Sequence, residues 1–210
     1  LVGEIPFRTV YLHGILRDKK GQKFSKSLGN GIDPIEIINK YGADALRMSL
    51  VVGIGPGNDA NFDENKVKSY KNFANKLWNI TRFVLSSTED VSVDRTFDRY
   101  SSVDTEIWKT WRDSLKDITS DMDNLRYYLA AEKLYHYAWH TFADIILEQS
   151  KEILLNGQEY DKVSRKNLLL NILSEILICL HPFMPFVTEE IWSSMPINDK
   201  KMLIIESWPI

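Results

Sequence analysis

The chain has 210 residues, 44% hydrophobic and 26% charged, a composition typical of a globular protein with one large or two small domains. Its 26 basic and 29 acidic side chains give a net charge of −3, so any nucleic-acid binding must use local patches and not a global positive field. A single cysteine, Cys179, excludes a disulfide within the chain and is expected to be a small buried side chain. Because no apolar run is long enough to span a membrane and no signal peptide is recognised, we expect a cytoplasmic protein.

The amino-terminal segment reads LVGEIPFRTVYLHGIL and has no initiator methionine. Within it, TVYLHGIL (residues 9–16) has the apolar, β-branched composition of a buried strand. Since a lone strand has no neighbour to pair with, we expect the chain to be a fragment of a longer protein.

Two short helices are predicted next. In DPIEIINKYG, Asp33 is placed as the N-cap, Pro34 as the first helical residue and Gly42 as the terminator. ADALRMSLVVG predicts a second helix that ends near Gly53, and GIGPGNDANF has the composition of a loop.

From Asp63 onward, helical periodicity replaces the glycine-rich pattern. STEDVSVDRTFDRYSS and NGQEYDKVS are predicted connections, and Pro182 and Pro185 separate the last two helices. Helices are expected at residues 63–87, 102–122, 125–154, 164–181 and 185–195. Short connections between antiparallel helices imply a bundle. The fold is therefore expected to be mainly α, with residues 1–62 as one part and a helical bundle over residues 63–210 as the other.

The segment GQKFSKSLGN (residues 21–30) gathers lysines and serines with no run of acids beside it. Three glycines let the backbone bend there: Gly21, Gly29 and Gly31. Lys23 and Lys26 offer ammonium groups on mobile stems, and Ser25 and Ser27 add hydroxyls. These groups suit a polyphosphate, yet the GxxxxGK[ST] spacing of a Walker loop is absent. The chemistry alone leaves a phosphate-binding loop and a solvated basic turn both open.

The string KFSKS resembles the KMSKS signature of class I aminoacyl-tRNA synthetases, with Phe24 at the usual methionine. RDKKGQKFSKSLGNGIDP and YGADALRMSL resemble the same family. GPGNDANF, NFANKLWNITRFVL and HPFMPFVTEEIW are most similar to the valyl enzymes, while FADIILE departs from them. Isoleucyl and leucyl enzymes share the signature and YGADALR, so they stay as alternatives, as does a catalytically silent tRNA-binding helical module.

The resemblance implies an ATP-binding loop formed by residues 23–27. In it, Lys26 would stabilise the charge on departing pyrophosphate, and Lys23 would assist at the phosphates. Ser25 and Ser27 would shape the loop and donate hydrogen bonds, and Phe24 would contribute backbone contacts near the adenine. The implied enzyme is a monomeric ligase that uses ATP with Mg²⁺, valine and tRNA(Val).

The resemblance also assigns roles to the two parts of the chain. Residues 1–62 would be the end of a Rossmann-like catalytic domain with a stem-contact segment, and residues 63–210 an anticodon-binding bundle. The other signature of such a catalytic domain is absent here, so this fragment alone is expected to be inactive.

One face of the helix expected at residues 63–87 is polar. At about 100° per residue, five side chains fall together on it: Lys68, Lys71, Asn75, Asn79 and Arg82. They suit contacts with tRNA phosphates and bases, although an ordinary solvated face would look the same. Trp78 borders this stripe, and we expect its ring to be buried in preference to stacking on a base.

Two further patterns are given structural explanations. His136 and His140 have metal-ligand spacing, but HYAWH lacks the glutamate of a zincin motif, so no metal site is predicted. Glu189 and Glu190 resemble a pair of catalytic acids, but we expect them in an early helical turn, where the helix dipole favours acidic side chains. The terminal IIESWPI is expected to be a strand or an extended tail.

Overall fold

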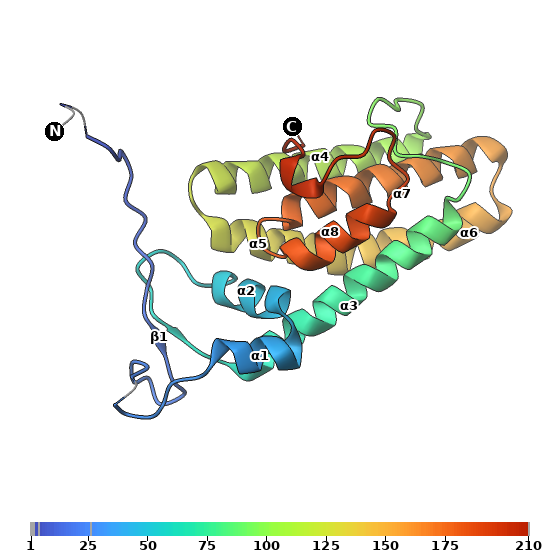
Figure 1. The fold of residues 1–210 in the computed structure, drawn as a ribbon. Helices are drawn as coiled ribbons and strands as arrows, with labels where there is room; N and C mark the ends of the chain where they lie inside the picture. The colour runs from blue at the N-terminus through green and yellow to red at the C-terminus, as the bar shows by residue number, and fades with distance from the viewer. Residues whose placement is uncertain (1–2, 4, 26, 210) are drawn as a thin grey trace.

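The computed structural model describes residue 3, residues 5–25 and residues 27–209, and the part described is mainly helical, as expected (Figure 1). An extended amino-terminal segment leads into two short helices, and the remaining helices pack around one core. The elements are β1 (Leu16–Arg17), α1 (Pro34–Tyr41), α2 (Ala43–Val51), β2 (Ala60–Asn61), α3 (Glu64–Ser87), α4 (Ser102–Asp123), α5 (Tyr127–His136), η1 (Tyr137–Leu147), α6 (Glu148–Asn156), α7 (Glu159–Leu180), α8 (Pro185–Ser194) and η2 (Leu203–Ile205).

The strand expected over residues 9–16 does not form. Only Leu16 and Arg17 pair, in parallel, with β2. The apolar side chains before them stay open to solvent, for example Phe7 at 75% and Val10 at 76% exposure. A strand is stabilised by hydrogen bonds to a neighbouring main chain. Here the neighbour is residues 57–62, and it bonds only to the last part of the segment.

Both predicted short helices are confirmed. The Asp33 side chain accepts the Ile35 amide at 2.8 Å, Pro34 occupies the first turn, and Gly42 ends α1 with a φ of 93°. A positive φ of this size favours glycine, which explains the sharp corner between α1 and α2. The second helix ends at Val51, two residues before Gly53.

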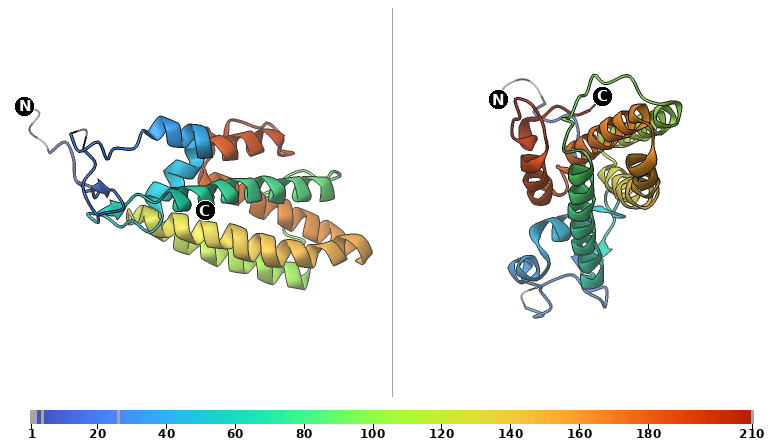
Figure 2. Two further views of the ribbon diagram at one scale, coloured as in Figure 1. Left: turned by 90° about the horizontal axis from the view of Figure 1, so that it is seen from below. Right: turned by 90° about the vertical axis from the view of Figure 1, so that its right-hand side faces the viewer.

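The bundle agrees with the sequence at three helices and departs from it elsewhere. α3, α4 and α8 match their predicted bounds within one residue. α7 begins at Glu159 and not at residue 164, because an exposed first turn needs no apolar residues and its acids suit the helix dipole. The helix expected over 125–154 is a continuous run of α5, η1 and α6 (Figure 2). Within this run, η1 is a π-helix. At the carboxyl-terminal end, the described residues form no strand: η2 ends at Ile205, and residues 206–209 follow as a tail without helix or strand, the other expected alternative.

The centre of the core is α7. Every residue from Asn167 to Leu180 is buried, and Cys179 is fully enclosed as predicted. Burial raises the pKa of the Cys179 thiol well above its ordinary value, so this thiol stays protonated. Within the described residues, no helix combines the length and apolarity needed to cross a bilayer.

A buried ion pair joins α7 to α4. Arg165 and Asp104 are each 1% exposed, and the guanidinium meets the carboxylate at 2.6 and 2.7 Å. Ser164 Oγ donates to the other carboxylate oxygen, and Arg165 also donates to Ser150 Oγ on α6 at 3.0 Å. One network therefore connects α4, α6 and α7.

Asp104→Asn should lower the free energy of unfolding by about 3–5 kcal/mol, because Arg165 is left as an uncompensated buried charge. Urea unfolding measures the change. The matched control is Lys151→Ala in an exposed pair with Glu148, which should cost less than about 1 kcal/mol. Equal effects of the two substitutions would contradict this account of the network.

Candidate nucleotide loop and nucleic-acid interface

The loop of residues 21–30 is closed at its base by Asp18 and Asn30. Asp18 Oδ1 accepts the amides of Lys20 and Gln22, both at 2.8 Å, and Asp18 Oδ2 accepts Asn30 Nδ2 at 2.9 Å. Asn30 Oδ1 in turn accepts the Ser25 amide at 2.9 Å. The Asn30 amide, followed by the Gln22 amide, lowers the pKa of Asp18 below its ordinary value. The anchor therefore keeps its negative charge at neutral pH.

A second contact fixes the start of the loop to β2. Arg17 Nε donates to Asp59 Oδ2 at 2.6 Å, and Asp59 Oδ1 accepts the Ile15 amide at 2.7 Å. These two partners lower the pKa of Asp59, the Ile15 amide contributing most. Arg17 also donates to the Gly21 carbonyl at 3.1 Å. These contacts hold the start of the loop beside Asp59, the residue before β2.

The loop side chains named from the sequence lie as follows. Lys23 is exposed, and Ser25 Oγ lies 2.7 Å from Ser27 Oγ. Phe24 is half-buried, with its ring 6.5 Å from that of Phe62. Lys26 lies outside the described residues. Phe24 therefore anchors the loop through its side chain, and a hollow of about 400 Å³ opens beside it.

The loop glycines differ in what the backbone requires of them. Gly21 and Gly29 have φ values of 77° and 61°, which favour glycine, whereas Gly31 has no such requirement. The bends predicted at Gly21 and Gly29 are confirmed.

Sequence reasoning did not name the four anchoring side chains: Arg17, Asp18, Asn30 and Asp59. An aspartate followed by a glycine three residues later is a turn signal, so the turn at Asp18 could have been predicted from the sequence. No local signal links Asp18 to Asn30 or Arg17 to Asp59, since these pairs are 12 and 42 residues apart.

The polar stripe on α3 is exposed along its whole length. All five of its members face solvent: Lys68, Lys71, Asn75, Asn79 and Arg82. Between Glu64 and Ser87 the sequence has five basic residues and one acid, Glu64, which pairs with Lys40 at 2.6 Å. A helix in a chain of net charge −3 thus presents a locally basic surface.

Two side chains modify this surface. Lys71 Nζ donates to the Lys40 carbonyl at 3.1 Å and lies 5.9 Å from the centre of the Tyr41 ring. Trp78 is 41% exposed, so the expectation that it is buried is wrong. By helical spacing, Trp78 lies between the polar stripe and the buried face of α3, so its indole is only partly covered.

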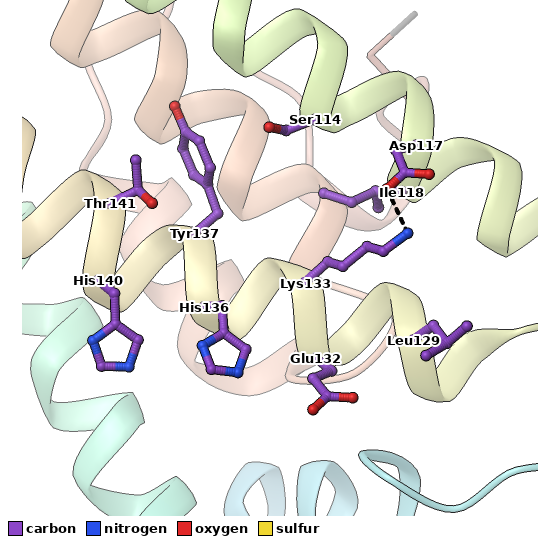
Figure 3. Close-up of a pocket in the computed structure, with 10 residues that line it drawn as sticks. All are labelled: Ser114, Asp117, Ile118, Leu129, Glu132, Lys133, His136, Tyr137, His140 and Thr141. Atoms are coloured by element: carbon purple, nitrogen blue, oxygen red, sulfur yellow. Dashed lines mark hydrogen bonds and ion pairs between the residues drawn. The ribbon is translucent and has the colours of Figure 1, made fainter.

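A pocket of about 640 Å³ lies beside His136 and His140 (Figure 3). The two rings are 5.4 Å apart and lie on one side of the helix, away from Tyr137. Lys133 crosses toward α4 and meets Asp117 at 2.5 Å. The described part of the chain contains no group of three His, Cys, Asp or Glu side chains placed to hold a metal.

The acids in α8 are placed differently from the expectation. Neither lies in the first turn. Glu189 Oε1 instead accepts the Leu203 amide at 2.9 Å, which holds η2 against α8. The helix-dipole explanation for Glu189 is therefore wrong.

Comparison with known families identifies the class of protein. Residues 104–210 match the family described as the anticodon-binding domain of tRNA ligase, and residues 1–63 match class I tRNA synthetases of the I, L, M and V group. The chain belongs to this family of tRNA-ligase anticodon-binding domains, joined to class I synthetase sequence.

Individual relatives give a more specific match than the two families. Valine–tRNA ligase of Clostridium tetani is 42% identical over 208 residues, which are 98% of this chain and 24% of the relative. Valine–tRNA ligase of Bacillus cereus is 41% identical over 210 residues, 99% of this chain and 24% of the relative. The chain thus spans about a quarter of the length of these relatives.

Solved structures support the fold. The Agrobacterium radiobacter K84 LeuRS–tRNA–LeuAMS complex matches with a TM-score of 0.73 at 23% identity, covering 94% of this chain and 23% of that one. Mycobacterium tuberculosis methionyl-tRNA synthetase with methionyl-adenylate matches with a TM-score of 0.67 at 21% identity, covering 85% and 36%. At these identities the likeness shows a shared architecture.

Asn30→Ala should loosen the loop, because Asp18 and the Ser25 amide both lose their partner. Trypsin should then cleave after Lys23 several-fold faster, as followed by mass spectrometry. Because the pKa of Asp18 is lowered, the anchor is present at neutral pH and is lost only as the pH falls through that lowered value. Asn156→Ala, which removes an exposed contact to Glu152, is the control and should leave this rate unchanged.

Proposed function

We propose that the chain is the carboxyl-terminal part of a valyl-tRNA synthetase, which activates valine with ATP and transfers it to tRNA(Val). The observation that carries this proposal is identity of about 40% to valine–tRNA ligases over nearly the whole chain. Because the chain spans only about a quarter of those relatives, the activity is assigned to the intact enzyme and not to this part alone. The intact enzyme is proposed to be a cytoplasmic monomer.

The proposed division places residues 1–62 at the end of the catalytic domain and residues 63–210 in the anticodon-binding bundle. The two family matches, at residues 1–63 and 104–210, support it. α3 is the structural link, since it packs along α2 at one end and against α7 and η1 further along (Figure 1).

The proposed chemistry at the loop follows from charge. The valine carboxylate attacks the α-phosphorus of ATP, the bond to the bridging oxygen breaks, and pyrophosphate leaves with additional negative charge. Lys26 and Lys23 stabilise that charge, and Ser25 and Ser27 donate hydrogen bonds to phosphate oxygens. The Asp18–Asn30 anchor holds both ends of the loop, so these groups can move together. Mg²⁺ would neutralise part of the phosphate charge and would arrive with ATP.

The proposed tRNA contact is the α3 stripe. Lys68, Lys71 and Arg82 suit phosphate oxygens, while Asn75 and Asn79 carry both donors and acceptors for base edges. The exposed indole of Trp78 adds a surface on which a base can stack. The local excess of basic residues on α3 supports this assignment.

The intact enzyme should show ATP–pyrophosphate exchange that depends on valine, and a purified fragment of residues 1–210 should show none. Lys23→Ala in the intact enzyme should lower kcat for exchange by about 100-fold, the usual cost of losing a group that stabilises transition-state charge. Lys20→Ala, outside residues 23–27, is the control. Exchange that depends on isoleucine or leucine in place of valine would transfer the assignment to the related enzymes.

Arg82→Ala should weaken tRNA binding and reduce the slope of log K against log salt by about 0.7–0.9, the loss of one phosphate contact. Filter binding over a range of salt concentrations measures the slope. Lys151→Ala, an exposed lysine on α6, should leave it unchanged. A slope that Arg82→Ala and Lys71→Ala both leave intact would exclude α3 as a tRNA contact.

A further inference from the structure

Two side chains of α2 reach across to the turn between α7 and α8. This turn contains Pro182 and Phe183 and follows directly after the buried α7. The contacts join parts of the chain that lie about 140 residues apart, since Asp44 and Phe186 are separated by 142 positions. They connect the segment that carries the loop to the bundle.

Asp44 supplies the cap that α8 lacks. The residue before α8 is Met184, which makes no side-chain cap, so the first amides of the helix need another acceptor. Asp44 Oδ2 accepts the Val187 amide at 2.7 Å, and Oδ1 accepts the Phe186 amide at 3.2 Å. Asp44 is only 7% exposed, so this cap is shielded from water.

Arg47 acts on the other side of the same turn. Its Nη2 donates to the Pro182 carbonyl at 2.9 Å, and its Nε donates to the Phe183 carbonyl at 3.3 Å. One turn of α2 therefore contributes an acceptor for the start of α8 and donors for carbonyls that follow α7. Together, these four hydrogen bonds define the clasp, formed by Asp44 and Arg47.

The clasp continues toward the loop through short connections. α2 joins α1 through Gly42 alone, and the two helices pack together. α1 is held to α3 by Lys40 and Tyr41, which both donate to Glu64, at 2.6 and 2.9 Å. Three residues separate the start of α1 from Asn30, the anchor of the loop. The loop base, α1 and α2 are therefore held to one another as one segment, and the clasp fixes the bundle relative to that segment.

We propose that Asp44 and Arg47 are positioning residues for aminoacylation: they fix the bundle relative to the loop, so that tRNA bound on the bundle is presented correctly for transfer. This rests on the proposed function, in which the two parts act on one tRNA. The clasp sets the rate of transfer to a whole tRNA, and it has no part in forming the adenylate.

The test compares a whole tRNA with an acceptor minihelix, an RNA hairpin that lacks the anticodon arm. In the intact enzyme, Arg47→Met and Asp44→Ala should lower kcat for charging whole tRNA by about 5-fold or more and leave its KM unchanged. Charging of the minihelix and valine-dependent ATP–pyrophosphate exchange should change by less than about 2-fold. Arg47→Lys and Asp44→Asn, which keep one hydrogen bond each, should give intermediate rates.

Asp33→Ala is the matched control, because it removes the cap of α1 in the same segment without contacting the bundle. It should leave the ratio of whole-tRNA to minihelix charging unchanged. An equal loss on both RNAs, a rise in KM alone, or no change with the clasp variants would overturn the proposal. Failure of the unmodified enzyme to charge tRNA with valine would instead overturn the proposed function, so the two failures are distinguishable.

Discussion

The burial of α7 on all sides from Asn167 to Leu180 is the constraint on which the rest of the bundle depends. A helical stretch without a solvent face is stable only if other elements cover its whole circumference, and here α3, α4, α5, α6 and α8 all contact α7. Its polar groups must then find partners inside the protein. Arg165 pairs with Asp104, and Glu175 accepts from Trp111 Nε1 at 2.5 Å and Arg112 at 2.8 Å. These pairs also determine which side of α7 faces α4, since an apolar surface alone leaves the rotation of a buried helix weakly defined.

Helices in the chain were predictable where their ends carry local signals. Asp33, Pro34 and Gly42 specify α1 within a few residues, because a cap acts on the amides next to it. The start of α7 at Glu159 was missed because its exposed first turns resemble a polar connection. The π-helix η1 was missed for a different reason: a shift of one residue in hydrogen bonding barely changes the apolar pattern of YAWHTFADIIL. The strand expected over residues 9–16 needed a neighbouring main chain, and residues 57–62 provide one only beside the last part of this segment.

The candidate site was predictable in composition and not in construction. KFSKS indicated the loop, and the periodicity of α3 placed its five polar side chains on an exposed face, as the structure confirms. The expectation that Trp78 is buried rested on the usual burial of tryptophan and was wrong, whereas the periodicity correctly placed this residue beside the exposed stripe. The contact between Asp18 and Asn30 could not be predicted, because it depends on how the loop folds back. Residue type thus reveals which groups are available, whereas their partners follow from tertiary structure.

In the clasp, only one side of the contact could be predicted from the sequence. MPF at the start of α8 offers no side-chain acceptor, and Pro185 itself has no amide to pair, so the Phe186 and Val187 amides require an acceptor from elsewhere. The need was visible in the sequence, but the supplier was not, because nothing local distinguishes Asp44 from the other acids. Burial raises the pKa of Asp44, and the Val187 and Phe186 amides oppose that rise. A carboxylate kept in such a costly place is explained by the contact it makes, and that contact joins the segment carrying the loop to the bundle.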